Sequence, residues 1–542
     1  MVFLMLAVGK PWGGVVEHEF PTAYSASDAF FHHAMTEYAK EDGRLKYAAP
    51  YSIGGYEGVL DSHPPLPYEL AASFSVLTGM ETHDTLFMLT VFIYLFAVLA
   101  AYLLWRKGSV AVALLALPFA LFMLQKRLLP LIYWGYWLLV PGITYMIASL
   151  WSLTIFDSKH GPWIMAFLFS AIALSHQPEF VYAGGFFGLF LLYRFYRERK
   201  ISPAILKKTG VFVLVIGALT FYSLLIFSAT FLQTEGYRGA FDFDVARGGY
   251  PAFDVPQMGW MGVVALVGVG VFFLMHKKKL QLTGYSFLYS FLLGFLIYLG
   301  LGKRAYAQRL FWIIYAAFFI GLALYFVLQF VSKKYRTLIP FVVSIVFILL
   351  FSRSLGADIG KNQGIMNEYD WDGLQWIAAN LPSDAWVHYL YSDTLIHNAP
   401  LYNSEHLAFK VGTNSYIKLI QTGTLQRNFS FGFTDGYIDR IHDRGVFDFC
   451  YFDQNLKPRN ESFECVDSYI RSARVPLADA RKDLCDMEYV YITKQTSQPA
   501  FGQYNSLVRE VLLSNNWTNE IYSNPLVSLV HNTQPGVECL NV

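Results

Sequence analysis

The sequence predicts a mostly α-helical, polytopic membrane protein with a C-terminal α/β domain, and three observations support this fold class. Of the 542 residues, 55% are hydrophobic and 18% are aromatic, and the mean hydropathy is +0.36. Only 15% are charged, against about 25% in a soluble globular domain. The shortage of charge ends near residue 354. We therefore divide the chain into a transmembrane domain, 1–354, and a soluble domain, 355–542.

The apolar runs of the first domain predict about ten or eleven membrane spans, because a helix needs about 20 apolar residues to cross a bilayer. The runs lie at 85–105, 109–124, 129–153, 161–176, 179–196, 209–232, 259–275, 283–301, 310–331 and 337–353. Residues 1–9 are apolar but too short to span, and they lack the features of a signal peptide. We interpret them as the end of a first helix.

Basic residues between the spans predict the orientation of the chain. Four groups of Lys and Arg fall on one side of the spans, which the positive-inside rule assigns to the cytoplasm. They lie at 106–107, 194–208, 277–279 and 333–336. The opposite, outer side then receives a long first loop, 10–84, and the soluble domain.

The composition of the soluble domain agrees with this extracytoplasmic position. All four cysteines lie there, as an oxidising compartment allows, and two disulfides are the simplest count. They are Cys450, Cys465, Cys485 and Cys539. Three N-glycosylation acceptors lie in the same domain, at Asn428, Asn460 and Asn516. The net charge of +1 gives no support for a nucleic-acid partner.

Runs rich in Val, Ile and Tyr predict strands in this domain at 385–391, 488–493 and 526–531. Helical stretches alternate with them, so we expect an α/β domain packed over the outer face. Nothing in it has the pattern of a catalytic motif.

The first outer loop contains a predicted helix over 27–43. Its apolar and aromatic residues recur at helical spacing, Ser27 or Asp28 can cap its start, and Gly43 can end it. A single apolar face predicts that this helix lies flat on the membrane surface. The prolines of 61–70 predict an extended turn in place of a helix.

The order of these features resembles the first outer loop of membrane glycosyltransferases of the GT-C fold. In that pattern an Asp, aromatic residues and a His open an amphipathic helix, as in Asp28–His33, and a Pro-Pro-Leu stretch follows, as at 64–66. The segment 309–315, which begins with Arg309, resembles a late helix of the archaeal oligosaccharyltransferase catalytic subunit. Residues 371–387 resemble the helix and turn that open the soluble domain of that family.

Two departures separate the chain from the oligosaccharyltransferase itself. The sequence His-Tyr-Leu-Tyr-Ser-Asp at 388–393 stands where that family has the Trp-Trp-Asp motif that reads the acceptor sequon. The outer loop at 125–127 lacks the second acidic metal motif. The resemblance therefore implies a different GT-C enzyme, which moves a sugar from a polyprenyl- or dolichyl-phosphate donor to a glycan, lipid or protein acceptor on the outer face of the cell membrane.

Asp28 is the predicted catalytic base, because the acceptor hydroxyl must lose a proton during transfer. The alternative role for Asp28 is a helix N-cap. His32, one turn later, and His33 are further catalytic candidates, which orient the carboxylate or contact phosphate. The alternative for both is an interfacial histidine with no such role. A divalent metal, Mg or Mn, is an open alternative, with Asp28 as a ligand if one is present.

Cations on the outer side are the predicted ligands of the donor phosphate, since a guanidinium fork can bind two phosphate oxygens. They are Arg127, Lys303, Arg304 and Arg309. The alternative for each is snorkelling to lipid headgroups. Three further acids, Asp61, Glu179 and Glu235, are candidate site residues, and turn or loop positions without a role are the alternative.

Three other functions stay open: an oligosaccharyltransferase paralogue that acts on Asn, a transporter, and an inactive surface scaffold. A transporter predicts ionisable residues at mid-membrane, whereas the predicted spans of this chain are poor in charge and the candidate site residues gather on the outer side. The expected partners are a lipid-linked sugar donor, a glycan or protein acceptor and membrane lipids. The sequons and the resemblance together predict an archaeal source.

Overall fold

The computed structural model describes most of the helical part of the chain and the sheet of the C-terminal domain. The described residues are 17–22, 24, 27–41, 43, 64–123, 135, 137–199, 202–233, 260–275, 284–289, 312–330, 335, 338–358, 366–382, 385–389, 407–410, 428–430, 481–483, 485, 488–495 and 499–537.

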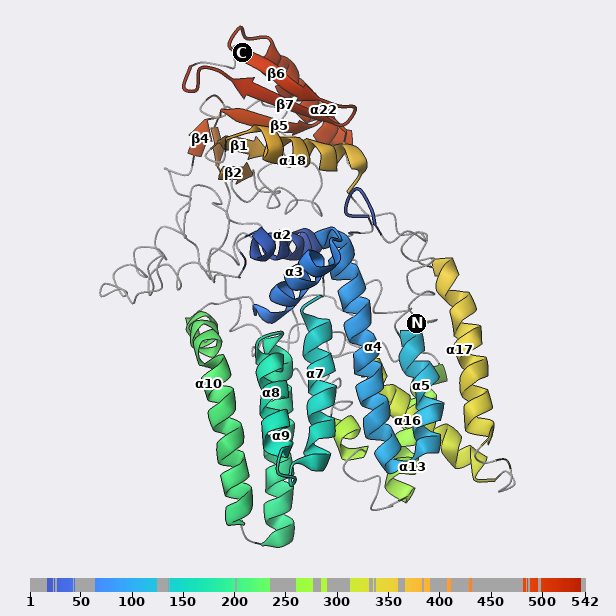
Figure 1. Ribbon diagram of the computed structural model, residues 1–542. Helices are drawn as coiled ribbons and strands as arrows, with labels where there is room; N and C mark the ends of the chain where they lie inside the picture. The colour runs from blue at the N-terminus through green and yellow to red at the C-terminus, as the bar shows by residue number, and fades with distance from the viewer. Residues whose placement is uncertain are drawn as a thin grey trace.

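Roughly aligned helices form one body, and two further helices lie across the end of it that faces the sheet (Figure 1). The two crossing helices are α2 (Ser27–Glu41) and α3 (Leu66–Thr78). The helices of the body are α4 (Thr82–Gly108), α5 (Val110–Met123), α7 (Leu139–Ser152), α8 (Gly161–Ala173), α9 (Gln177–Glu198), α10 (Pro203–Gln233), α13 (Trp260–Met275), α16 (Trp312–Leu328) and α17 (Leu338–Asp358). A short 3₁₀ turn, η2 (Leu153–Ile155), follows α7.

The predicted apolar runs coincide with these helices, and the run at 283–301 is described only over its helical residues 284–289. By length and hydropathy, two of the described helices are able to cross a membrane, namely Thr82–Gly108 and the 21 residues Pro203–Ser223 of α10. Six shorter apolar helices accompany them. The count of ten or eleven spans therefore stays a prediction.

The solvent-exposed surface of the helical body carries many large apolar side chains. Leu192, Leu214, Phe221, Leu274 and Leu349 are each 61% exposed or more. Contiguous apolar surface of this kind is rare on soluble monomers and marks contact with lipid or with another protein. The helices thus have the surface expected of the predicted transmembrane domain.

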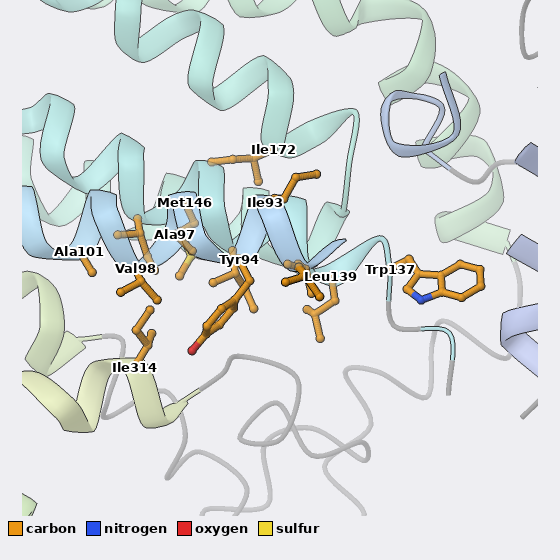
Figure 2. Packing of buried hydrophobic residues seen from close by; sticks show 14 of the residues in the cluster. Ile93, Tyr94, Ala97, Val98, Ala101, Trp137, Leu139, Met146, Ile172 and Ile314 are labelled. Atoms are coloured by element: carbon orange, nitrogen blue, oxygen red, sulfur yellow. The ribbon is translucent and has the colours of Figure 1, made fainter. Parts of the chain in front are cut away.

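The core lies where α4, α7, α8 and α16 meet, and Figure 2 shows Ile93, Val98, Met146, Ile172 and Ile314 converging there. The buried Tyr94 hydroxyl is satisfied, because it donates a hydrogen bond to the Ala120 carbonyl of α5 over 2.7 Å. Aromatic and aliphatic side chains from distant segments therefore fix the arrangement of the helices.

A glycine lets α16 approach α5 closely. A Cβ atom at Gly321 would lie 2.7 Å from the Val112 carbonyl oxygen and 2.8 Å from the Ala116 backbone nitrogen. Small residues at helix contacts permit such backbone approach in membrane proteins.

The C-terminal domain contains a mixed five-stranded sheet with the strand order β2-β1-β5-β7-β6. Its strands are β1 (Trp386–Tyr389), β2 (Leu407–Lys410), β5 (Tyr489–Thr493), β6 (Thr518–Ser523) and β7 (Val527–Asn532). Strand β1 is parallel to β2 and β5, and the other pairs are antiparallel. A separate antiparallel pair consists of β3 (Asn428–Ser430) and β4 (Arg481–Asp483). The three strands predicted from the sequence are confirmed.

Helix α18 (Glu368–Asn380) packs on this sheet, and α22 (Pro499–Leu513) adjoins it. Asn367 caps α18, since its side chain accepts a hydrogen bond from the Asp370 N–H over 2.9 Å. The Tyr491 hydroxyl of β5 donates to the Asp370 carbonyl over 3.2 Å. Helix α17 continues past the predicted boundary at 354 to Asp358, and the division into two domains otherwise stays a prediction.

One prediction about the first outer loop is wrong. The prolines of 61–70 do not prevent a helix, because α3 starts at Leu66 with Pro65 at its N-cap and Pro67 in its first turn. Those positions need no intrahelical N–H donor, so proline is tolerated there. Helix α2 is buried on more than one face, since Phe30, Met35 and most of its other described side chains are buried, and its place on the membrane surface stays a prediction.

Candidate active site

The first turn of α4, formed by Thr82, His83 and Asp84, contacts the first outer loop through all three of its residues. The Thr82 hydroxyl donates to the Glu37 carboxylate of α2. His83 Nε2 donates to the His18 carbonyl over 2.7 Å. Asp84 accepts from the backbone N–H and from Nδ1 of the same His18, each over 2.7 Å. Because a carboxylate only accepts, the His18 ring nitrogen carries the proton.

His33 of α2 lies in an aromatic box between the helical body and the C-terminal domain. Its ring stacks on Trp371 of α18 at a centroid distance of 5.6 Å and an interplanar angle of 27°. The Tyr24 ring meets it edge-on at 5.9 Å, and the His83 ring lies at 5.9 Å. Burial lowers the pKa of His33 well below its usual value, and nearby His83 and Lys40 lower it further. The imidazole is therefore neutral at physiological pH.

His32 points to a different environment. Its Nδ1 lies 2.7 Å from the Tyr68 hydroxyl of α3. The pair forms one wall of a narrow, mainly apolar pocket at the end of the helical body. The other lining residues are Pro67, Leu86, Leu89, Thr90, Ile93, Trp137, Leu138 and Pro141. The two histidines predicted from the sequence thus lie in adjoining environments: His33 in the aromatic box and His32 in the wall of the apolar pocket.

Glu179 is fully buried at the start of α9. The hairpin between α8 and α9 brings it to His176, whose Nδ1 donates to Glu179 Oε2. The Leu174 carbonyl of the same hairpin accepts from the Leu66 N–H over 3.0 Å, so α3 lies against it. Gly142 of α7 packs at this point, because an added Cβ would lie 2.8 Å from His176 Cβ and 3.3 Å from Glu179 Oε2.

Within the part of the chain that the structure describes, several buried polar atoms in the layer between the helical body and the C-terminal domain have no hydrogen-bond partner. A buried polar group without a partner costs about 1–3 kcal/mol, and ordered water or a ligand commonly satisfies it. The atoms belong to Thr22, Tyr24, His83, Thr85, Trp137, Ser175 and Glu179. They surround α2 and the adjoining ends of α4, α7, α8 and α9. The layer therefore has the polar capacity to hold water or a hydroxyl-rich ligand.

The structure places Asp28 in the first turn of α2, one turn before His32, and its side chain is not among the described atoms. The predicted site residues Asp61, Arg127, Glu235, Lys303, Arg304 and Arg309 lie outside the described residues. So do Cys450, Cys465 and Cys539. Cys485 is buried and is not a free thiol, and its disulfide pairing stays a prediction. Within the described ranges, no group of three or more His, Cys, Asp or Glu residues is placed to hold a metal ion.

Sequence analysis missed the first turn of α4 and its partners. The available signal was the sequence Thr-His-Asp at 82–84, where a carboxylate and an imidazole directly precede a long apolar run. Ionisable residues at such a membrane boundary are functional candidates. Their partner His18 is 66 positions away in the chain, and no sequence periodicity connects the two.

No family model matches the chain, and no curated protein matches it. Solved structures do. The apo oligosaccharyltransferase of Archaeoglobus fulgidus has a TM-score of 0.56 at 11% identity, over 91% of this chain and 69% of the other. Arabinofuranosyltransferase AftD from Mycobacteria has a TM-score of 0.55 at 11% identity, over 99% of this chain and 40% of the other.

A third structure matches nearly end to end. ArnT from Cupriavidus metallidurans, bound to undecaprenyl phosphate, has a TM-score of 0.54 at 10% identity, over 98% of this chain and 96% of the other. All three are GT-C fold glycosyltransferases. The predicted resemblance is confirmed at the level of the fold: the chain has the GT-C fold.

Proposed function

We propose that the chain is a membrane glycosyltransferase that moves one sugar from a polyprenyl-phosphate donor to an acceptor hydroxyl on the outer face of the membrane. One observation carries the proposal. Helix α2, with Asp28 in its first turn and His32 and His33 buried, lies in the layer of unpartnered polar atoms between the helical body and the C-terminal domain.

The fold neighbours support the donor class. One structure of the Archaeoglobus fulgidus oligosaccharyltransferase contains a dolichol-phosphate and an inhibitory peptide, with a TM-score of 0.51 at 12% identity. The ArnT structure contains undecaprenyl phosphate. Both ligands join a long isoprenoid chain to a phosphate, which suits a site at a membrane boundary. The exposed apolar surface of the helical body also favours a lipid environment.

The proposed reaction needs one general base. The acceptor oxygen forms a bond to the anomeric carbon, and the bond from that carbon to the phosphate oxygen breaks. The polyprenyl phosphate leaves with the bonding electrons, and the hydroxyl proton passes to the Asp28 carboxylate. A base on the face opposite the leaving phosphate gives inversion at the anomeric carbon.

The other predicted residues have supporting roles in this proposal. Arg304 and Arg309 bind the donor phosphate, helped by Lys303 and Arg127. Helix α2 lines the apolar pocket through His32, which pairs with Tyr68. The fully buried Glu179 is the second candidate acid. The Trp-Trp-Asp motif is missing, and this absence disfavours transfer of a whole glycan to Asn, which is the alternative reaction.

The test is a transfer assay with the purified full-length protein in detergent. Radiolabelled polyprenyl-monophosphate sugars and polyprenyl-pyrophosphate glycans are offered in parallel, with and without Mg²⁺ or Mn²⁺. We expect consumption of a monophosphate donor, and a loss of about 10²–10⁴-fold in the Asp28→Asn protein. Asp157→Asn is the control, because Asp157 is 65% exposed and pairs with Arg194 at the opposite end of the helical body.

Each other outcome contradicts part of the proposal. Consumption of only the pyrophosphate glycan, with metal, would assign the protein to the oligosaccharyltransferase branch. Full activity of Asp28→Asn would refute Asp28 as the base. No turnover of either donor by the wild-type protein would favour the scaffold.

A further inference from the structure

We propose that the first turn of α4 sets the position of α2 for catalysis, with Thr82 and Asp84 as positioning residues. This inference rests on the proposed function, since the position matters for transfer only if α2 carries the base. Thr82, His83 and Asp84 each contact the outer loop by a different hydrogen bond, and all three are at most 2% exposed.

An ordinary capping role does not explain Asp84. Aspartate near a helix start commonly caps free N–H groups of its own helix. In α4 the N-cap position is Glu81, and it makes no side-chain cap hydrogen bond. Both Asp84 oxygens instead accept from His18, which is 66 positions earlier in the chain. The carboxylate therefore joins the outer loop to the longest apolar span among the described helices.

The contacts of α2 with the first turn of α4 fall on its second half and centre, while the proposed base is at its start. Thr82 contacts Glu37, and His83 lies against His33. With a rise of about 1.5 Å per residue, Asp28 is about 13 Å from Glu37 along the helix. A tilt of about 5° around Glu37 therefore moves Asp28 by about 1 Å, and a misplacement of that size can reduce a rate about 10²-fold.

The experiment measures transfer and helix order separately in the purified full-length protein. Thr82→Val removes the hydroxyl and keeps the shape, and Thr82→Ser restores the hydroxyl. Asp84→Asn removes the charge, and Asp157→Asn is the matched control at the opposite end. We expect kcat to fall about tenfold or more in Thr82→Val and Asp84→Asn, while KM for the lipid donor changes less than about twofold, because neither residue is a proposed ligand of the donor phosphate.

Hydrogen exchange of the α2 amides gives the second readout. We expect exchange to become about 10–100-fold faster in Thr82→Val and Asp84→Asn, and to stay unchanged in Thr82→Ser and Asp157→Asn. Unchanged α2 exchange in both disruptive variants would overturn the proposal. Faster exchange with unchanged kcat would overturn the positioning role. A wild-type protein that transfers no sugar would overturn the proposed function, and the exchange data would still decide whether the first turn of α4 orders α2.

Discussion

Replacing Gly142 by alanine tests how tightly α7 packs on the buried His176–Glu179 pair. The added Cβ would lie 2.8 Å from His176 Cβ and 3.3 Å from Glu179 Oε2. Since carbon atoms prefer separations of about 3.5–4.0 Å, α7 and the start of α9 must separate by about 0.7 Å or more. Overpacking of this kind costs about 1–3 kcal/mol, and the better helix propensity of alanine offsets up to about 1 kcal/mol.

We therefore expect a net destabilisation of about 1–2 kcal/mol, seen as a fall in apparent melting temperature on the order of 1–2 °C. The assay is thermal unfolding of the purified protein in one detergent, followed by transfer activity at a temperature where both proteins are folded. Gly217→Ala in α10 is the matched control, because an added Cβ there meets nothing within 4 Å. If Gly142→Ala were as stable as this control, the packing argument at the hairpin would be refuted.

Two further predictions concern other parts of the molecule. Gly321→Ala should destabilise the helical body by at least as much as Gly142→Ala, because the added Cβ would meet the Ala116 backbone, which cannot rotate away. The same melting assay and control apply. An unchanged melting temperature would contradict the close approach of α16 to α5. In the C-terminal domain, burial acts to raise the pKa of Glu520, but hydrogen bonds from Ser528 and Arg509 outweigh it and lower the pKa below 4.5. A lowered folded-state pKa gives stability that is present above the unfolded value and lost as the pH falls below about 4.5. Glu520→Gln should therefore reduce the loss of stability measured as the pH is lowered below about 4.5. The same loss in both proteins would exclude Glu520 as a source of the pH dependence.

The sequence predicted the elements better than the contacts between them. Hydrophobic runs placed the long helices, and Val-, Ile- and Tyr-rich runs placed three strands of the sheet, because both signals are local and periodic. Helix α3 is not predicted by the proline pattern, because proline excludes a residue from a helix interior but is tolerated in the first turn, where these prolines lie. The position of a proline within a helix therefore decides whether the helix can form.

The candidate site was predicted only in part, because the sequence pattern reports local elements and not the contacts between distant segments. The helix that carries Asp28, His32 and His33 follows from spacing and capping residues. The hydrogen bonds of His18 to Asp84, and the stack of His33 on Trp371, join segments far apart in the chain. Such contacts are set by tertiary packing, and a single sequence contains no local pattern that reports them.

The stack of His33 on Trp371 also determines when the site is completed during synthesis. The two rings are more than 300 positions apart in the chain, and N-terminal parts of a protein fold first as it is made. Helix α2 is therefore synthesised before the helix that covers it. Trp371 can pack on His33 only after the ribosome has translated α18. A chain that stops before α18 would contain the candidate base and the whole helical body, yet its outer layer would stay open to water.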